Sequence, residues 1–155
     1  EILAFHDKLV ELKGFDEEYF GKKKLGIMRV LKEVQTSHAQ WNDDGYAVEE
    51  ASRRLQKKLL ENEATGALVV FSDGQPAPSS KHSGPEYELH EIVRKWAARI
   101  PLIGVGIGPG MERTIKEYYG KNGLPVPEVD KLPRELLKIL SVQVARFEKR
   151  SSPSG

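Results

Sequence analysis

The chain has 155 residues, 39% apolar and 30% charged, which suits one α/β domain with a buried core. Its 24 Lys and Arg residues nearly balance 23 Asp and Glu residues, so no broad basic surface for nucleic acid is expected. The longest apolar run, Ala67 to Phe71, is far shorter than the roughly 20 residues of a membrane-spanning helix. The chain has no cysteine, which excludes disulfides, thiolate catalysis and cysteine-bound zinc. We therefore expect a cytoplasmic protein that binds neither nucleic acid nor membranes.

The N-terminal half predicts a hairpin followed by two helices. Short apolar runs at 1–5 and 9–12 surround a polar turn and predict two paired strands. An acidic first turn and apolar residues at three-residue spacing predict a helix over 16–34. Residues 47–59 place apolar side chains on one side and charged ones on the other, which predicts a second helix.

The C-terminal half alternates strands and helices. The continuous apolar run 67–71 is typical of a strand buried on both faces of a parallel sheet. A polar loop then leads, through capping-box spacing at 83–86, to a helix over 89–97. Further strands are expected at 101–107 and 125–129, further helices at 111–119 and 136–147, and a disordered tail at 149–155. This order predicts a single α/β domain over 1–148, doubly wound, with a mostly parallel sheet and helices on both faces.

Two polar loops are the candidate functional site. In a doubly wound fold, ligands gather where the carboxyl ends of the strands meet. Ser72-Asp73-Gly74 follows the most apolar strand, and Asn42-Asp43-Asp44-Gly45 precedes a helix. Because carboxylate and amide oxygens suit Mg²⁺, Ca²⁺ or Mn²⁺, we predict Asn42, Asp44 and Asp73 as metal ligands. The same residue types also form ordinary turns and helix caps, which is the structural alternative.

At these loops the sequence resembles the von Willebrand factor A domains. Leu68-Val-Val-Phe-Ser-Asp73-Gly74 is similar to their Asp-Gly loop after a buried strand, and Asn42-Asp-Asp-Gly45-Tyr-Ala47-Val48 to their Thr-x-x-Gly-x-Ala-Leu helix entry. The asparagine in place of threonine resembles the final domain of the CobT-type subunit of aerobic cobaltochelatase. Residues 1–5, 72–76, 84–87 and 103–108 resemble that subunit too, so the likeness extends over about 1–147.

The resemblance implies a non-catalytic, cation-assisted protein-interaction domain. At the family's metal-ion-dependent adhesion site, the cation keeps one coordination position open for a partner's carboxylate. Trp41, Asp43, Ser72 and Gln75 would then contact the partner, although a buried aromatic that holds the loop is the better explanation of Trp41. For the chelatase branch the implied partner is an AAA+ ATPase, and the implied process is cobalt insertion in cobalamin biosynthesis. An accessory domain that recruits such an ATPase for other remodelling fits the sequence as well.

One departure from the family concerns its central first strand. That strand carries the motif Asp-x-Ser-x-Ser, which is missing from this chain. By resemblance Glu1 opens the second strand, which leaves runs 2–5 and 68–71 with unpaired edges. The strand then lies in an upstream segment, comes from another molecule, or is replaced by a rearranged sheet. We expect a strand exchanged between molecules, and hence a homo-oligomer, rather than direct pairing of the two runs. Without that strand, Mg²⁺ binding should be weak or absent.

A different class of function depends on the glycine-rich segment Gly104 to Gly110. It follows a predicted strand and precedes a predicted helix, as the phosphate loop of a nucleotide- or small-molecule-binding enzyme domain does. The spacing fails the dinucleotide pattern, because the last required glycine falls on Pro109 or Met111. This reading is therefore the alternative to the interaction domain.

Overall fold

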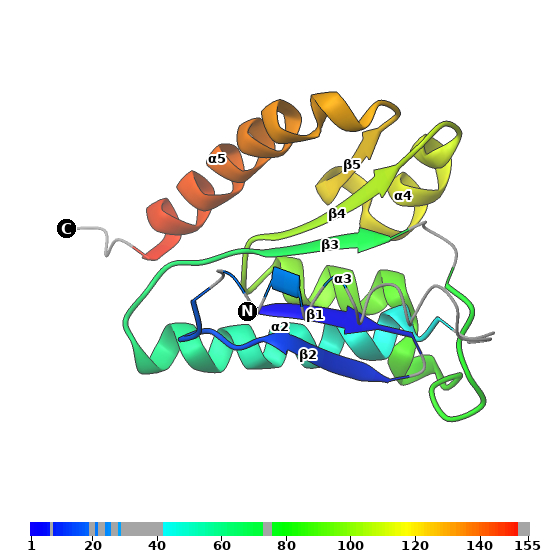
Figure 1. The fold of residues 1–155 in the computed structure, drawn as a ribbon, viewed down its shortest axis with the longest axis horizontal. Coiled ribbons are helices and arrows are strands. Elements are labelled where there is room, and N and C mark those ends of the chain that lie inside the picture. Colours follow the sequence, from blue (N-terminus) through cyan, green and yellow to red (C-terminus); the bar gives the residue numbers. More distant parts are fainter. Residues whose placement is uncertain are drawn as a thin grey trace.

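The computed structural model describes residues 1–6, 8–18, 21, 24–25, 28, 42–72 and 76–151. Within these ranges the chain forms five strands and four α-helices (Figure 1). The strands are β1 (Ile2–Phe5), β2 (Leu9–Lys13), β3 (Leu68–Ser72), β4 (Leu102–Ile107) and β5 (Gly123–Val126). The helices are α2 (Asp44–Glu61), α3 (Leu89–Ala97), α4 (Met111–Tyr119) and α5 (Leu132–Ser151), with short 3₁₀ turns η1 (Pro85–Tyr87), η2 (Gly120–Asn122) and η3 (Val129–Lys131).

The described strands form two separate sheets. β1 and β2 make an antiparallel hairpin, and β3, β4 and β5 make a parallel sheet in that order. Helix α3 connects β3 to β4, and α4 connects β4 to β5, as parallel neighbours require. The prediction of a mixed α/β chain with a parallel sheet is therefore confirmed.

Helices cover both faces of the parallel sheet. Along β4, Leu102 joins a core cluster shared with α2, α3 and α4, whereas Ile103 and Val105 join a second cluster with α5. Gly104 and Gly106 lie on the first face, where a Cβ at Gly104 would overlap the ring of Tyr119. Side chains alternate between the two faces of β4, so its branched residues pack against α5. The glycines between them face α4 and allow that helix to approach the strand closely.

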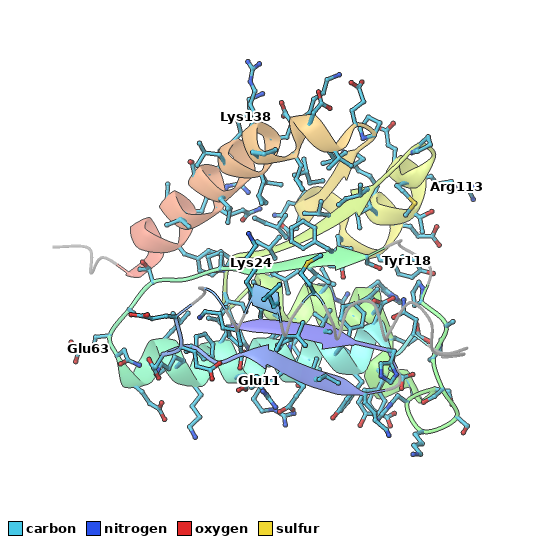
Figure 2. The ribbon with its side chains drawn as sticks, in the orientation of Figure 1. Glu11, Lys24, Glu63, Arg113, Tyr118 and Lys138 are labelled. Atoms are coloured by element: carbon cyan, nitrogen blue, oxygen red, sulfur yellow. The ribbon has the colours of Figure 1, made fainter. Side chains whose placement is uncertain are left out.

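The β1–β2 hairpin is held by α2 rather than by the parallel sheet. Arg54 on α2 forms ion pairs with Glu1 (3.4 Å) and with Glu11 (3.1 Å), the latter labelled in Figure 2. The backbone amide of Asp43 also donates a hydrogen bond to the carbonyl oxygen of His6 at 2.9 Å. The hairpin therefore lies over the helix, with one edge directed toward β3.

Several element boundaries differ from the prediction. β5 ends at Val126, whereas a strand was predicted at 125–129, because the chain turns into η3. α5 extends from Leu132 to Ser151, so residues 149–151 of the predicted tail are helical. Most of the helix predicted at 16–34, and residues 152–155 of the tail, lie outside the described residues.

The prediction that β3 is buried on both faces is wrong. The side chain of Phe71 is 48% exposed, because among the described residues β3 pairs with β4 alone. Among the described residues, 2–5 and 68–71 do not pair directly with each other, and the expected strand exchange stays a prediction. As for membranes, no helix in the described ranges combines the length and the apolar character needed to cross one.

Candidate functional site

The carboxyl end of β3 meets the N-terminus of α2. The hydroxyl of Ser72 donates a long hydrogen bond of 3.5 Å to Oδ1 of Asp44, and the side-chain amide of Asn42 donates to Oδ2 at 3.1 Å. Asp44 is fully buried in the first turn of α2, where the helix dipole stabilises its negative charge. The structure therefore brings together Asn42, Asp44 and Ser72 from the two predicted loops, and their roles toward a metal or a partner stay predictions.

Three predicted site residues, Trp41, Asp73 and Gln75, lie outside the described residues. The distance expected between Asn42 and Asp73 is accordingly untested. Within the described ranges, no group of three or more His, Asp or Glu side chains is arranged to hold a metal ion. The described donors at the corner are one carboxylate, one hydroxyl and one amide, so the predicted set depends on Asp73 for its second carboxylate.

Asp43 does not face a partner as expected. Its side chain is completely buried, and it accepts hydrogen bonds from the backbone amide and the hydroxyl (2.8 Å) of Ser79. Nδ1 of His82 lies 2.6 Å from the same carboxylate. Burial tends to raise the pKa of Asp43, but the hydrogen bonds from His82 and Ser79 outweigh it and hold the pKa below its usual value. We call Asp43, Ser79 and His82 the polar clamp.

The polar clamp fastens loop 76–84 to the start of α2. Asn42 and Ala77 exchange two backbone hydrogen bonds, of 2.8 and 3.1 Å, in an isolated antiparallel bridge. The His82 ring stacks on Tyr46, with centroids 4.1 Å apart, and meets the edge of Tyr87 at 5.1 Å. Asp43 occupies the N-cap position without capping the helix through its side chain. Its carboxylate instead binds Ser79 and His82 of the loop, which explains a short acidic side chain at that position.

Gly45 is required at this corner for a steric reason. A Cβ at Gly45 would overlap the backbone carbonyl of Tyr87, which lies against the first turn of α2. The close approach leaves a small pocket of about 140 Å³ between α2, the polar clamp and Tyr118, which is labelled in Figure 2. The glycine of the helix-entry pattern is thus explained by backbone packing.

Tyr119 is a candidate site residue that sequence reasoning missed. Its side chain is buried, and its hydroxyl has no hydrogen-bond partner among the described residues. Burial raises the pKa of this phenol, and the nearby charge of Asp44 raises it further. In the sequence Tyr119 is one of the apolar positions of a helix, so no pattern separates it from an ordinary core aromatic. The same holds for Ser79 and His82, because their partner Asp43 lies 36 and 39 residues away.

The glycine-rich segment is explained by packing and turn geometry. Gly104 and Gly106 lie inside β4 against α4, and only Gly108 and Gly110 belong to the turn that follows the strand. Both have a positive φ, 113° and 83°, which residues other than glycine rarely adopt. Nucleotide binding by this segment stays an untested alternative, and its glycines do not require it.

Comparisons with known proteins give one distant relative. The uncharacterized protein YojO of Bacillus subtilis (strain 168) is 37% identical over 114 residues. The matched part covers 69% of this chain and 17% of YojO, so the chain corresponds to a small part of that protein. No protein-family model and no solved structure matches the chain.

Proposed function

We propose that this chain is a von Willebrand factor A-type domain whose corner between β3 and α2 binds a divalent cation and, through it, a carboxylate of a protein partner. The contact between Ser72 and Asp44 carries the proposal, because it joins two loops that are 28 residues apart in sequence. Those are the two loops through which the sequence resembles the family. The resemblance thus selects positions that also lie together in the fold.

The donor atoms at the corner are chemically suited to a hard cation. The carboxylate of Asp44, the hydroxyl of Ser72 and the amide of Asn42 all offer oxygen, which Mg²⁺, Ca²⁺ and Mn²⁺ prefer. The unpartnered Tyr119 hydroxyl near Asp44 supports a polar occupant there, since buried hydroxyls are normally hydrogen-bonded. Because three donors leave much of a six-coordinate shell to water, we expect binding in about the millimolar range.

The proposed partner follows from the resemblance to the CobT-type branch. It is an AAA+ ATPase, and the proposed process is cobalt insertion, to which this domain would contribute contacts and no catalysis. Asp43 is not part of the proposed contact surface, because its carboxylate is engaged within the chain. Ser72, Trp41 and Gln75 remain its proposed members.

Paramagnetic Mn²⁺ tests the cation site. We expect Mn²⁺ at about millimolar concentration to broaden the amide NMR signals of residues 42–46 and 72 selectively, since its effect falls steeply with distance from the bound ion. Competition with Mg²⁺ should restore those signals. Asp44→Asn, which keeps the side-chain shape, should abolish the selective broadening.

Asp130→Asn is the matched control, because Asp130 lies exposed in η3. It should leave the broadening pattern unchanged. Uniform broadening over the surface, or selective broadening that persists in both Asp44→Asn and Asp73→Asn, would contradict the proposed site.

A further inference from the structure

Tyr119 combines a well-packed ring with a hydroxyl that its neighbours do not explain. The residue ends α4 and is 2% exposed, and its hydroxyl has no hydrogen-bond partner among the described residues. A phenylalanine would fill the same space in the core without burying a polar atom. Because an unsatisfied buried hydroxyl destabilises a fold, a tyrosine at this position indicates a polar contact that the described side chains do not make directly.

The packing of the ring places Tyr119 next to the buried start of α2. The ring lies against Gly104 of β4, where a Cβ would overlap it. On α2, Val48 belongs to the same core cluster as Tyr119. Asp44 precedes Val48 by four residues, so the two side chains share one face of the helix, about 5–6 Å apart. Both are buried, which puts the Asp44 carboxylate in the region that the Tyr119 ring covers.

Asp44 is the charged group that acts on the phenol. Burial raises the pKa of Tyr119, and the charge of Asp44 raises it further, so at neutral pH the hydroxyl carries its proton and can donate it. A carboxylate offers about four acceptor positions. Asn42 and Ser72 donate to Asp44, which leaves capacity for a further donor. A donor and an acceptor that lie close without direct contact are commonly joined by one water.

We propose that Tyr119 is a positioning residue of the corner, whose hydroxyl donates through one bridging water to the carboxylate of Asp44 and holds that carboxylate in place. The inference rests on the proposed function in so far as Asp44 is a cation ligand, but the contact itself requires no bound cation. Hydrogen bonds from outer groups orient metal-binding carboxylates and strengthen metal binding. Tyr119 thus acts on the cation through Asp44 and does not touch it.

Urea denaturation without divalent cations tests whether the hydroxyl is satisfied. Tyr119→Phe keeps the ring and removes the oxygen, so we expect the equilibrium constant for unfolding to rise by about tenfold. A hydroxyl without a partner predicts the opposite, because its removal would leave stability unchanged or increase it. The matched control is Tyr118→Phe, at the half-buried neighbour labelled in Figure 2, which should change the constant by no more than about twofold.

A double-mutant cycle tests whether Asp44 is the partner. If one water joins the two side chains, either substitution breaks the bridge. The combined effect of Tyr119→Phe and Asp44→Asn on the unfolding constant should therefore be smaller than the product of the single effects, by about threefold to tenfold. The control cycle replaces Asp44→Asn by Asp130→Asn, at an exposed position, and should be additive.

A titration with Mn²⁺ connects this contact to the cation site. In Tyr119→Phe, the selective broadening of residues 42–46 and 72 should require about tenfold more Mn²⁺ than in the wild type. Tyr118→Phe should titrate as the wild type does. A role of Tyr119 in core packing alone would leave the Mn²⁺ affinity unchanged, because Phe packs in the same way.

Three results would overturn the inference. They are an unchanged or increased stability of Tyr119→Phe, additive effects of Tyr119→Phe and Asp44→Asn, and an unchanged Mn²⁺ affinity of Tyr119→Phe when the wild type binds the ion. If Asp44→Asn fails to fold, the first and third measurements still decide, since neither alters Asp44. A non-additive cycle in a wild type that binds no Mn²⁺ would refute the proposed function and still support the contact between Tyr119 and Asp44.

Discussion

The corner at the start of α2 and the groove along the same helix, between β1 and β3, solve opposite packing problems. At the corner, Asp43 is buried with partners for its carboxylate from Ser79 and His82. Along the groove, about one and two turns further into α2, Ala47 and Ala51 face an apolar space of about 440 Å³ next to strand edges that have no described neighbour. One end of the helix is therefore a closed polar junction, and the middle is an open apolar one.

The difference shows which contacts a single stretch of chain can complete. Loop 76–84 supplies both the backbone bridge and the side chains that the corner needs, so the junction closes within the described chain. Along the groove, the described part of the chain has no strand between β1 and β3. Substitutions at the corner should therefore be costly, whereas added volume in the groove should be tolerated.

The largest effect is expected for Gly45→Ala. The new methyl group would overlap the carbonyl of Tyr87, and because both groups belong to the backbone, α2 and η1 would have to separate. We expect a loss of about 3 kcal/mol in the free energy of unfolding, measured by urea denaturation. Gly14→Ala is the control, since its Cβ would meet only ordinary contacts, and it should change stability by less than about 1 kcal/mol. Equal effects of the two substitutions would contradict the close approach.

Asp43→Asn should have the next largest effect. The amide group keeps the shape of the side chain but replaces an acceptor oxygen by a donor, which leaves Ser79 or His82 without its acceptor. The expected loss is about 1–3 kcal/mol in the same measurement. Asp130→Asn, at an exposed position, serves as the control and should change stability by less than about 0.5 kcal/mol. An unchanged urea midpoint for Asp43→Asn would show that the polar clamp contributes nothing.

The contribution of Asp43 should also depend on pH. Its folded-state pKa is lowered, so the stabilisation is complete above the unfolded pKa of about 3.9 and is lost as the pH falls through the lower folded value. The stability difference between the wild type and Asp43→Asn should thus be constant just above pH 5 and shrink below about pH 4. Urea midpoints of both proteins, measured from above pH 5 to below pH 4, test whether the stability difference shrinks on acidification. A difference that grows on acidification would be inconsistent with a lowered pKa.

The smallest effect is expected for Ala51→Leu in the groove. The added carbons enter an open apolar space, so stability should change by less than about 1 kcal/mol. Val105→Leu, which adds one carbon in the closed core between β4 and α5, should cost about 1–3 kcal/mol although it adds less volume. If Ala51→Leu costs as much as Val105→Leu, the groove is not open in solution.

The elements could be predicted from the sequence because they depend on local patterns. The apolar stripe of α2 repeats within one helix, and β4 is a continuous apolar run between turns. The meeting of Asn42, Asp44 and Ser72 was also predictable, since it follows from where strands and helices end in an α/β fold.

The polar clamp and the exposure of β3 could not be predicted in this way. Asp43 finds His82 across 39 residues, and the sequence near either one carries no sign of the other. The run 67–71 has the composition of a strand with neighbours on both sides, but composition does not say whether the described chain supplies them. The first failure concerns partners that are distant in sequence, and the second concerns a neighbouring strand that the run itself does not encode.

The attachment of the hairpin to α2 makes that part of the molecule sensitive to ionic strength. Arg54 pairs with Glu11, whose side chain is 50% exposed, and with Glu1, whose side chain is 10% exposed. An exposed pair such as the one with Glu11 contributes only about 0.2–1 kcal/mol at low salt. At about 1 M salt the screening length falls to about 3 Å, which weakens the exposed pair with Glu11 more than the part-buried pair with Glu1. The parallel sheet is held by backbone bonds and a buried core, which salt does not screen in this manner. Concentrated salt should therefore loosen the hairpin before it affects the parallel sheet, so the width of the groove is set partly by the solvent.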